Sequence, residues 1–231
     1  MSREAEILRG LFEHTLGGDA PEVRALTEEG LRLGMAPLVL LDEGLLPALE
    51  EVGRRFERRD FFVPEMLVAA KAMLGALAVL RPLLSQTGAK PVATIVMATV
   101  RGDLHDIGKN LCNIMLDGAG FNVIDLGTNV SADAVVAAVR EHEPPLVGLS
   151  AFLTTTMPMF KVTIDALGHA GLRDRVHVLV GGAPVTAEYA ERIGADGYAP
   201  HANSLVRLAK QLVEGAGPDP GRVAAEGALH G

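Results

Sequence analysis

The spacing of apolar residues along the chain changes near residue 90. Before that point, apolar residues recur at helical intervals in five segments, 7–16, 23–33, 38–41, 45–56 and 66–80. Glycines and prolines separate these segments: Gly17 and Gly18 end the first, Pro37 starts the third, Gly44 precedes the fourth, and Pro64 starts the fifth. The pattern predicts a small antiparallel helical bundle over residues 1–88.

After a polar, turn-rich stretch at 85–91, the expected linker, short β-branched runs alternate with helical segments. The expected strands are 92–99, 122–126, 146–150, 176–180 and 197–199, and the helices that follow them are 107–119, 132–141, 157–170, 186–193 and 204–213. Five βα units predict an α/β domain over 89–214, with a five-stranded parallel sheet and helices on both faces. The flavodoxin-like strand order 2-1-3-4-5 is the common solution. The tail, 215–231, is rich in Gly, Ala and Pro and is expected to be disordered.

Composition and charge exclude several classes of function. The chain has 231 residues, of which 48% are hydrophobic and 22% charged, and its net charge is −8. The one notable basic cluster, at 54–59, is flanked by acidic residues, so we expect no nucleic-acid binding. The charged N-terminus and the lack of an apolar stretch of about 20 residues predict no signal peptide and no membrane span, hence a cytoplasmic protein. The single cysteine, Cys112, excludes an intrachain disulfide and a cysteine-cluster metal site.

The candidate chemistry is concentrated in residues 101–110, RGDLHDIGKN. This stretch lies between the first strand and the next helix, so Asp103 and His105 fall at the carboxyl edge of the sheet, where open parallel sheets bind ligands. A histidine whose other ring nitrogen is held by a carboxylate is a well-oriented metal ligand. Gly108 would let a bulky group approach the backbone. The alternative is that Asp103 caps the helix and His105 is a solvated turn residue.

Three further loops lie at the same edge. The predicted strand order places the loops after the first and third strands at the switch point, where the ligand crevice is expected. The loop after the third strand, 150–156, carries hydroxyl groups and no charge; they are suited to a polar ligand arm or to the Asp103–His105 pair, or else they cap the following helix. After the fourth strand, Gly181 and Gly182 permit close backbone approach. The fifth is followed by His201.

The motif Asp103-x-His105-x-x-Gly108, followed by Ser150 and then Gly181-Gly182, resembles the corrinoid-binding signature of cobalamin proteins. Residues 102–110 are similar to the cobalamin module of methionine synthase. They resemble still more the corrinoid carrier proteins of methanol, methylamine and O-demethylase methyltransferase systems. The Phe-Phe-Val-Pro-Glu helix start at 61–65 and the Thr-Thr-Thr-Met turn at 154–157 belong to the same pattern. The resemblance covers about residues 4–213.

The resemblance implies bound cobalamin or a related corrinoid, base-off, with His105 as lower axial ligand to cobalt. Asp103 would hold the other imidazole nitrogen, and Thr156, where methionine synthase has Ser, would extend the relay. The further cofactor contacts that it implies are Gly102, Leu104, Asp106, Ile107, Gly108, Ser150, Phe152, Leu153, Thr154, Gly181, Gly182, Ala183, His201 and Ala202, with Phe61, Met66 and Met73 of the helical cap toward the upper face. One departure stands out: the Ser-x-Leu element of the family reads Ser150-Ala151-Phe152 here.

The function that the resemblance implies is a methyl carrier that is not catalytic alone. It would cycle between methylcobalamin and cob(I)alamin, serving a substrate-specific methyltransferase and an acceptor methyltransferase, with a corrinoid-reactivating protein as a further partner. The alternatives are a cobalamin-responsive sensor or storage protein, the small subunit of a carbon-skeleton mutase, and a nucleotide-binding flavodoxin-like domain. The lack of a Gly-rich first loop argues against the last of these.

Overall fold

The computed structural model describes residues 2–86 and 91–215. The chain divides near residue 90 into two compact units. The predicted linker at 85–91 and the predicted tail fall largely outside the described residues.

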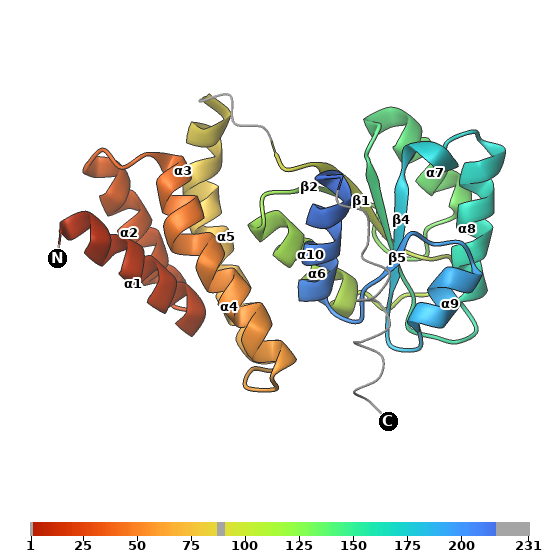
Figure 1. Cartoon of the computed structure of the whole chain (residues 1–231), viewed down its shortest axis with the longest axis horizontal. Helices are drawn as coiled ribbons and strands as arrows, with labels where there is room; N and C mark the ends of the chain where they lie inside the picture. Colours follow the sequence, from red (N-terminus) through yellow and green to blue (C-terminus); the bar gives the residue numbers. More distant parts are fainter. Residues whose placement is uncertain (1, 87–90, 216–231) are drawn as a thin grey trace. The chain divides into compact units, whose positions relative to one another are not determined.

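The first unit is helical (Figure 1). Its elements are α1 (Arg3–Gly17), α2 (Ala20–Arg32), α3 (Pro37–Val39), the π-helical turn η1 (Leu40–Leu45), α4 (Leu46–Glu57) and α5 (Val63–Gln86). Side chains of Ser2 and Asp19 cap the starts of α1 and α2. The core of the unit is formed by apolar side chains from α1, α2, η1 and α5, among them Ile7, Leu11, Val23, Leu40, Met73 and Leu80.

Two expectations for this unit were wrong. Residues 37–57 form one continuous helical run rather than two helices, with a π-helical turn in its middle. Pro47, in the first turn of α4, has no N–H to donate to the preceding turn, and a wider turn accommodates such a gap. Gly44 does not break the helix but permits close packing, since a Cβ there would lie 3.0 Å from Leu11 Cδ1.

The expectation that no long apolar stretch exists was also wrong. Within α5, Val63–Leu84 is long and apolar enough, by length and composition, to cross a membrane. The reason lies in the bundle: α5 packs against α1, α2 and α4, and small apolar side chains such as Ala69, Ala72 and Ala76 are buried along it. A helix that contacts several others is apolar around much of its circumference.

The second unit is the predicted α/β fold. Its strands β1 (Thr94–Thr99), β2 (Asn122–Asp125), β3 (Leu146–Ser150), β4 (His177–Gly181) and β5 (Gly197–Tyr198) form a parallel sheet in the order β2-β1-β3-β4-β5. The helices are α6 (Ile107–Gly118), α7 (Ala132–His142), α8 (Pro158–His169), α9 (Ala187–Arg192) and α10 (Ala202–Val213), with a short 3-10 turn η2 (Arg173–Arg175). Fold class and strand order are therefore confirmed, and each strand boundary lies within two residues of its prediction.

Figure 1 shows α6 and α10 on one side of this sheet and α7, α8 and α9 on the other. Alternate residues of β1, Val96 and Ala98, pack with Val135 of α7 and Phe160 of α8 in one buried cluster. The order of strands reverses between β1 and β3, and the register aligns Thr99, Ser150 and Gly181 where β1, β3 and β4 end. The loops that follow these strands therefore meet at one edge.

Candidate functional site

The loop after β1 carries a buried carboxylate. The chain turns sharply there: Asp103 N–H donates to the Val100 carbonyl (3.1 Å), and Gly102 adopts a left-handed conformation with φ of 84°. The turn directs the Asp103 side chain inward, where the residue is fully buried (0% exposed).

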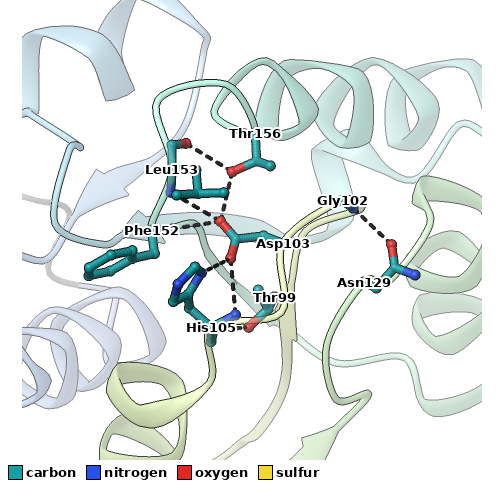
Figure 2. A network of polar contacts seen from close by, with 8 residues as sticks. All are labelled: Thr99, Gly102, Asp103, His105, Asn129, Phe152, Leu153 and Thr156. Carbon is teal, nitrogen blue, oxygen red and sulfur yellow. Dashed lines mark hydrogen bonds and ion pairs between the residues drawn. The ribbon is translucent and has the colours of Figure 1, made fainter.

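Five donors converge on the Asp103 carboxylate (Figure 2). Oδ1 accepts from the His105 backbone N–H (3.0 Å) and faces His105 Nδ1 (2.8 Å). Oδ2 accepts from the backbone N–H groups of Phe152 (2.8 Å) and Leu153 (3.1 Å) and from the Thr156 hydroxyl (2.7 Å). Burial raises the pKa of Asp103, but the hydrogen bonds from Thr156, from the backbone and from His105 outweigh it and hold that pKa well below its usual range. Asp103 is thus an ionised acceptor that joins two loops, not the helix cap of the alternative interpretation.

His105 is oriented by this carboxylate. Because an ionised carboxylate only accepts, His105 Nδ1 carries the proton, and the lone pair of the neutral ring lies on Nε2. The side chain is half exposed (49%), its ring stacks on Phe152 with centroids 4.4 Å apart, and its backbone carbonyl accepts from the Thr99 hydroxyl (3.1 Å). Among the residues that the structure describes, none hydrogen-bonds to Nε2. The ring is therefore fixed while one ring nitrogen stays available to a ligand.

The hydroxyl groups after β3 take different positions. Thr156 is buried, and its single proton is shared between Asp103 Oδ2 and the Leu153 carbonyl (2.9 Å). It does not cap the next helix, and α8 begins at Pro158 without a side-chain cap. Ser150 is the last residue of β3 and is half-buried, whereas Thr154 is exposed. Of these hydroxyls, then, Thr156 supports Asp103, and Thr154 faces solvent.

Apolar side chains next to His105 are exposed to solvent. Leu104 and Ile107 are more than 70% exposed, Phe152 is 53% exposed and Leu153 is 40% exposed. A Cβ placed on Gly108 would meet no atom within 4 Å, so the space beside the start of α6 is open. Exposed apolar groups around a single available ring nitrogen suit a large ligand that is partly apolar and carries a metal. A macrocycle that already supplies most of the ligands of its metal would need one further donor from the protein, and His105 Nε2 fits that need.

The glycines after β4 make room for the protein's own backbone. A Cβ on Gly182, whose φ is 131°, would lie 1.8 Å from the Ala151 carbonyl oxygen, and one on Gly181 would lie 2.8 Å from the Ala199 carbonyl oxygen. These two residues therefore hold the loops after β3, β4 and β5 together, while Ala183 beside them is exposed. This use of glycine differs from the ligand approach that the sequence suggested.

The remaining predicted residues are His201 and Ala202 at the start of α10 and three residues of the helical unit. His201 caps α10, its Nδ1 lying 2.9 Å from Ser204 Oγ, and Ala202 is buried. In the helical unit, Met66 and Met73 are buried, and the Arg55 guanidinium lies over the Phe61 ring, 5.2 Å from its centroid. An open cleft beside α7 and α8, lined by Arg101 and Ser131 among others, contains none of the predicted site residues.

Several residues that hold the site were missed by the sequence reasoning. Asn129 binds the backbone at Gly102 and Asp103, and Thr99 binds the His105 carbonyl. The ammonium of buried Lys109 lies 2.6 Å from Asp125 Oδ2 at the end of β2. Lysine is seldom buried unless it is paired, but nothing in the local sequence identifies its partner 16 residues away.

Comparison with known proteins identifies the relatives of this arrangement. Residues 93–207 match the family model described as B12 binding domain, and residues 7–81 match a second model of the same description. The chain is 39% identical over 215 residues to a dimethylamine corrinoid protein of Methanosarcina barkeri, covering 92% of this chain and all of that protein.

Solved structures agree with the sequence relatives. A cobalamin-binding protein from Desulfitobacterium hafniense has a TM-score of 0.76 at 31% identity, covering 89% of this chain and 98% of that chain. A chain of the methanol:cobalamin methyltransferase complex MtaBC from Methanosarcina barkeri has a TM-score of 0.78 at 29% identity, covering 91% of this chain and 80% of that chain.

Proposed function

The chain belongs to the corrinoid-binding proteins of methyltransferase systems, and from that premise we propose that it is a methyl carrier. It receives a methyl group from a substrate-specific methyltransferase and delivers it to an acceptor methyltransferase. The similarity to a dimethylamine corrinoid protein and to a chain of a methanol:cobalamin methyltransferase complex supports methyltransferase partners. In this proposal the chain is cytoplasmic, has no catalytic activity without its partners, and depends on a corrinoid-reactivating protein when its cofactor becomes oxidised.

One observation carries the proposal: His105 Nδ1 faces a buried, ionised Asp103, and its Nε2 is available. In the proposed site, His105 Nε2 would hold the cobalt of a corrinoid that is bound base-off. The corrinoid, when bound, supplies the cobalt centre that takes up and releases the methyl group. In residues 2–86 and 91–215, no three His, Cys, Asp or Glu side chains gather as a metal site.

The residues behind His105 control its basicity. An ionised acceptor at Nδ1–H increases electron density on the imidazole and strengthens Nε2 as a ligand. The Thr156 hydroxyl and the backbone donors of Phe152 and Leu153 keep Asp103 ionised, so His105 retains its proton on Nδ1.

Other residues would shape the cofactor surface. The open space beside Gly108, the exposed hydroxyl of Thr154 and the half-buried Ser150 at the end of β3 would be available to the nucleotide tail of the cofactor. The exposed side chains of Leu104 and Ile107 would lose contact with water under a corrin ring, which favours binding.

The first test is retention of the cofactor. Purified apoprotein is mixed with hydroxocobalamin in the dark and desalted, and absorption spectra are compared for the wild type, His105→Ala and the control His142→Ala, an exposed histidine in the last turn of α7. We expect one corrinoid per wild-type and control chain, and a ligand-field spectrum that changes only in His105→Ala. A folded wild type that retains no corrinoid would refute the proposal.

The second test separates a carrier from a sensor. A carrier accepts a methyl group on its reduced cofactor and passes it to an acceptor methyltransferase, whereas a sensor changes oligomeric state with light or with the upper ligand. Single-turnover methyl transfer from a chemical donor, measured beside size-exclusion chromatography in light and dark, distinguishes them. A light-dependent change of oligomer with no methyl uptake would favour the sensor.

A further inference from the structure

We infer that Asn129, in the loop between β2 and α7, is a positioning residue that fixes the turn carrying Asp103 and thereby the cobalt-facing nitrogen of His105. The inference rests on the proposed function, because positioning His105 matters only where His105 is a ligand. Figure 2 shows Asn129 on the opposite side of the turn from Phe152 and Leu153.

Two hydrogen bonds join Asn129 to the turn. Its backbone N–H donates to the Asp103 carbonyl (2.9 Å), and its side-chain Oδ1 accepts from the Gly102 N–H (2.8 Å). Asn129 thus pairs with the N–H of Gly102 and with the carbonyl of Asp103, two consecutive residues of the turn. Its side-chain oxygen accepts from the Gly102 N–H, as a backbone carbonyl would do in a β-bridge.

The loop that holds Asn129 is itself fixed to β1. Thr99 N–H donates to the Gly127 carbonyl and Val130 N–H donates to the Thr99 carbonyl, each at 3.0 Å, and Val100 forms a parallel bridge with Val130. Asn129 lies between these two anchoring residues, Gly127 and Val130. Its contacts with Gly102 and Asp103 therefore tie the turn to the sheet rather than to a mobile surface loop.

The backbone conformation of Asn129 explains why asparagine suits this position. Its φ is 54°, a left-handed conformation that is uncommon outside glycine and in which Asn is enriched. Glycine would take this conformation without strain but would provide no acceptor for the Gly102 N–H. Asparagine combines the allowed backbone with the acceptor.

The consequence for His105 follows from how Asp103 is held. The loop after β3 holds the Asp103 carboxylate, while Asn129 holds the Asp103 carbonyl and the peptide before it. His105 Nδ1 is bound by that carboxylate and by no other described residue. If the turn moves on the Asn129 side, the Asp103 carboxylate that orients the imidazole moves with it. The ring then has more angular freedom, which would weaken the proposed bond from His105 to cobalt.

The test uses two substitutions, one that removes the side-chain acceptor and one that keeps it. Asn129→Gly keeps the allowed backbone and removes Oδ1, whereas Asn129→Asp keeps an oxygen acceptor. In the apoprotein, amide hydrogen exchange at Gly102 should be about fivefold faster in the Gly variant, the effect of losing one hydrogen bond, and within about twofold of the wild type in the Asp variant. Thermal unfolding is measured alongside, to show that both variants are folded.

The second readout concerns His105 itself. Each protein is produced with nitrogen-15-labelled histidine, loaded with hydroxocobalamin and reduced to Co(II), and electron paramagnetic resonance measures the share of cobalt with the nitrogen-15 splitting of a histidine, which differs from that of the unlabelled benzimidazole of the cofactor. We expect the ratio of unligated to histidine-ligated cobalt to rise about fivefold in Asn129→Gly and to return toward the wild-type value in Asn129→Asp.

The outcomes separate the inference from the function on which it rests. A wild type without the nitrogen splitting would refute the proposed function. A wild type with the splitting, and an Asn129→Gly variant with the same share of ligated cobalt, would overturn the inference alone, even if exchange at Gly102 were faster. In that case Asn129 would hold the turn without positioning the ligand.

Discussion

The substitution Asp103→Asn tests the central unit of the site with a nearly isosteric change. The amide must place an NH2 group where one carboxylate oxygen now accepts. At the Oδ2 position it would face two backbone N–H groups and the Thr156 hydroxyl; at the Oδ1 position it would face the His105 N–H and Nδ1. The second placement is less costly, since the imidazole can change tautomer and become an acceptor, but it still leaves the His105 backbone N–H unpaired.

The magnitude follows from these contacts. One unsatisfied buried donor costs about 1–3 kcal/mol, and the hydrogen bonds that lose charge assistance weaken by about 1 kcal/mol each. Relief of the burial of a charge offsets part of this loss, so we expect the free energy of unfolding to fall by about 3 kcal/mol. Urea unfolding of the apoprotein at pH 7 measures it. The control is Asp106→Asn, because the half-buried Asp106 carboxylate accepts from only one described residue, Asn110, through Nδ2 (3.0 Å), and we expect a loss below about 1 kcal/mol there.

The pH dependence has a defined sign. The pKa of Asp103 is lower in the folded than in the unfolded protein, so its stabilisation is complete above the unfolded pKa of about 3.9 and is lost as the pH falls through the folded value. The Asn variant lacks this contribution. The stability difference between wild type and Asp103→Asn should therefore narrow as the pH is lowered from 5 to 2.

The tautomer gives an independent check. In the wild type the imidazole proton is on Nδ1; in Asp103→Asn it moves to Nε2, which removes the lone pair proposed to bind cobalt. Nitrogen-15 chemical shifts of the His105 ring report the tautomer directly. A variant with wild-type stability, the same tautomer and an unchanged corrinoid spectrum would refute this account of the site.

Three further substitutions or modifications test the packing around the site. Gly182→Ala should reduce the free energy of unfolding by more than about 2 kcal/mol, since its Cβ would overlap a backbone carbonyl at φ of 131°, whereas Gly168→Ala, in α8 with no neighbour within 4 Å, should change it by less than about 1 kcal/mol. Lys109→Met should lower the free energy of unfolding, measured in urea, by about 2 kcal/mol, because Asp125 loses the buried ammonium that pairs with it. The control Lys161→Met removes one member of an exposed pair and should lower it by less than about 0.5 kcal/mol. Burial raises the pKa of Cys112 to about 12, so its thiol should react slowly with a disulfide reagent at pH 8 and become fast in urea.

The architecture was predictable because its signals are local. Short β-branched runs separated by helical periodicity identify five βα units, and the preference for one strand order then places the loops after β1 and β3 together. The errors arose where a residue acts over a distance. Gly44 looked like a helix break, yet it packs against Leu11, more than thirty residues earlier, and Gly182 looked like room for a ligand, yet it accommodates the Ala151 carbonyl.

The chemistry of the site was only partly predictable. Asp103 and His105 are two residues apart on one turn, so their pairing is a local feature, and the resemblance to cobalamin proteins added Thr156. The backbone donors at Phe152 and Leu153 carry no residue identity, because every non-proline residue has an N–H. Asn129 could be suspected only as a turn residue, since its partners at 102 and 103 lie on another loop.

The hydrogen-bonding groups that could not be identified from the sequence also make the site rigid without its cofactor. Asp103 is fixed by three loops, after β1, β2 and β3, through contacts that are present in the chain by itself. The cost of ordering these groups is thus met during folding, and in the proposed site a corrinoid would meet an imidazole that already has its lone pair on Nε2. Phe152 donates its backbone N–H to Asp103 and stacks its ring on His105, so, in the proposed site, a substitution of Phe152 should alter cobalt ligation by His105 more than it alters folding.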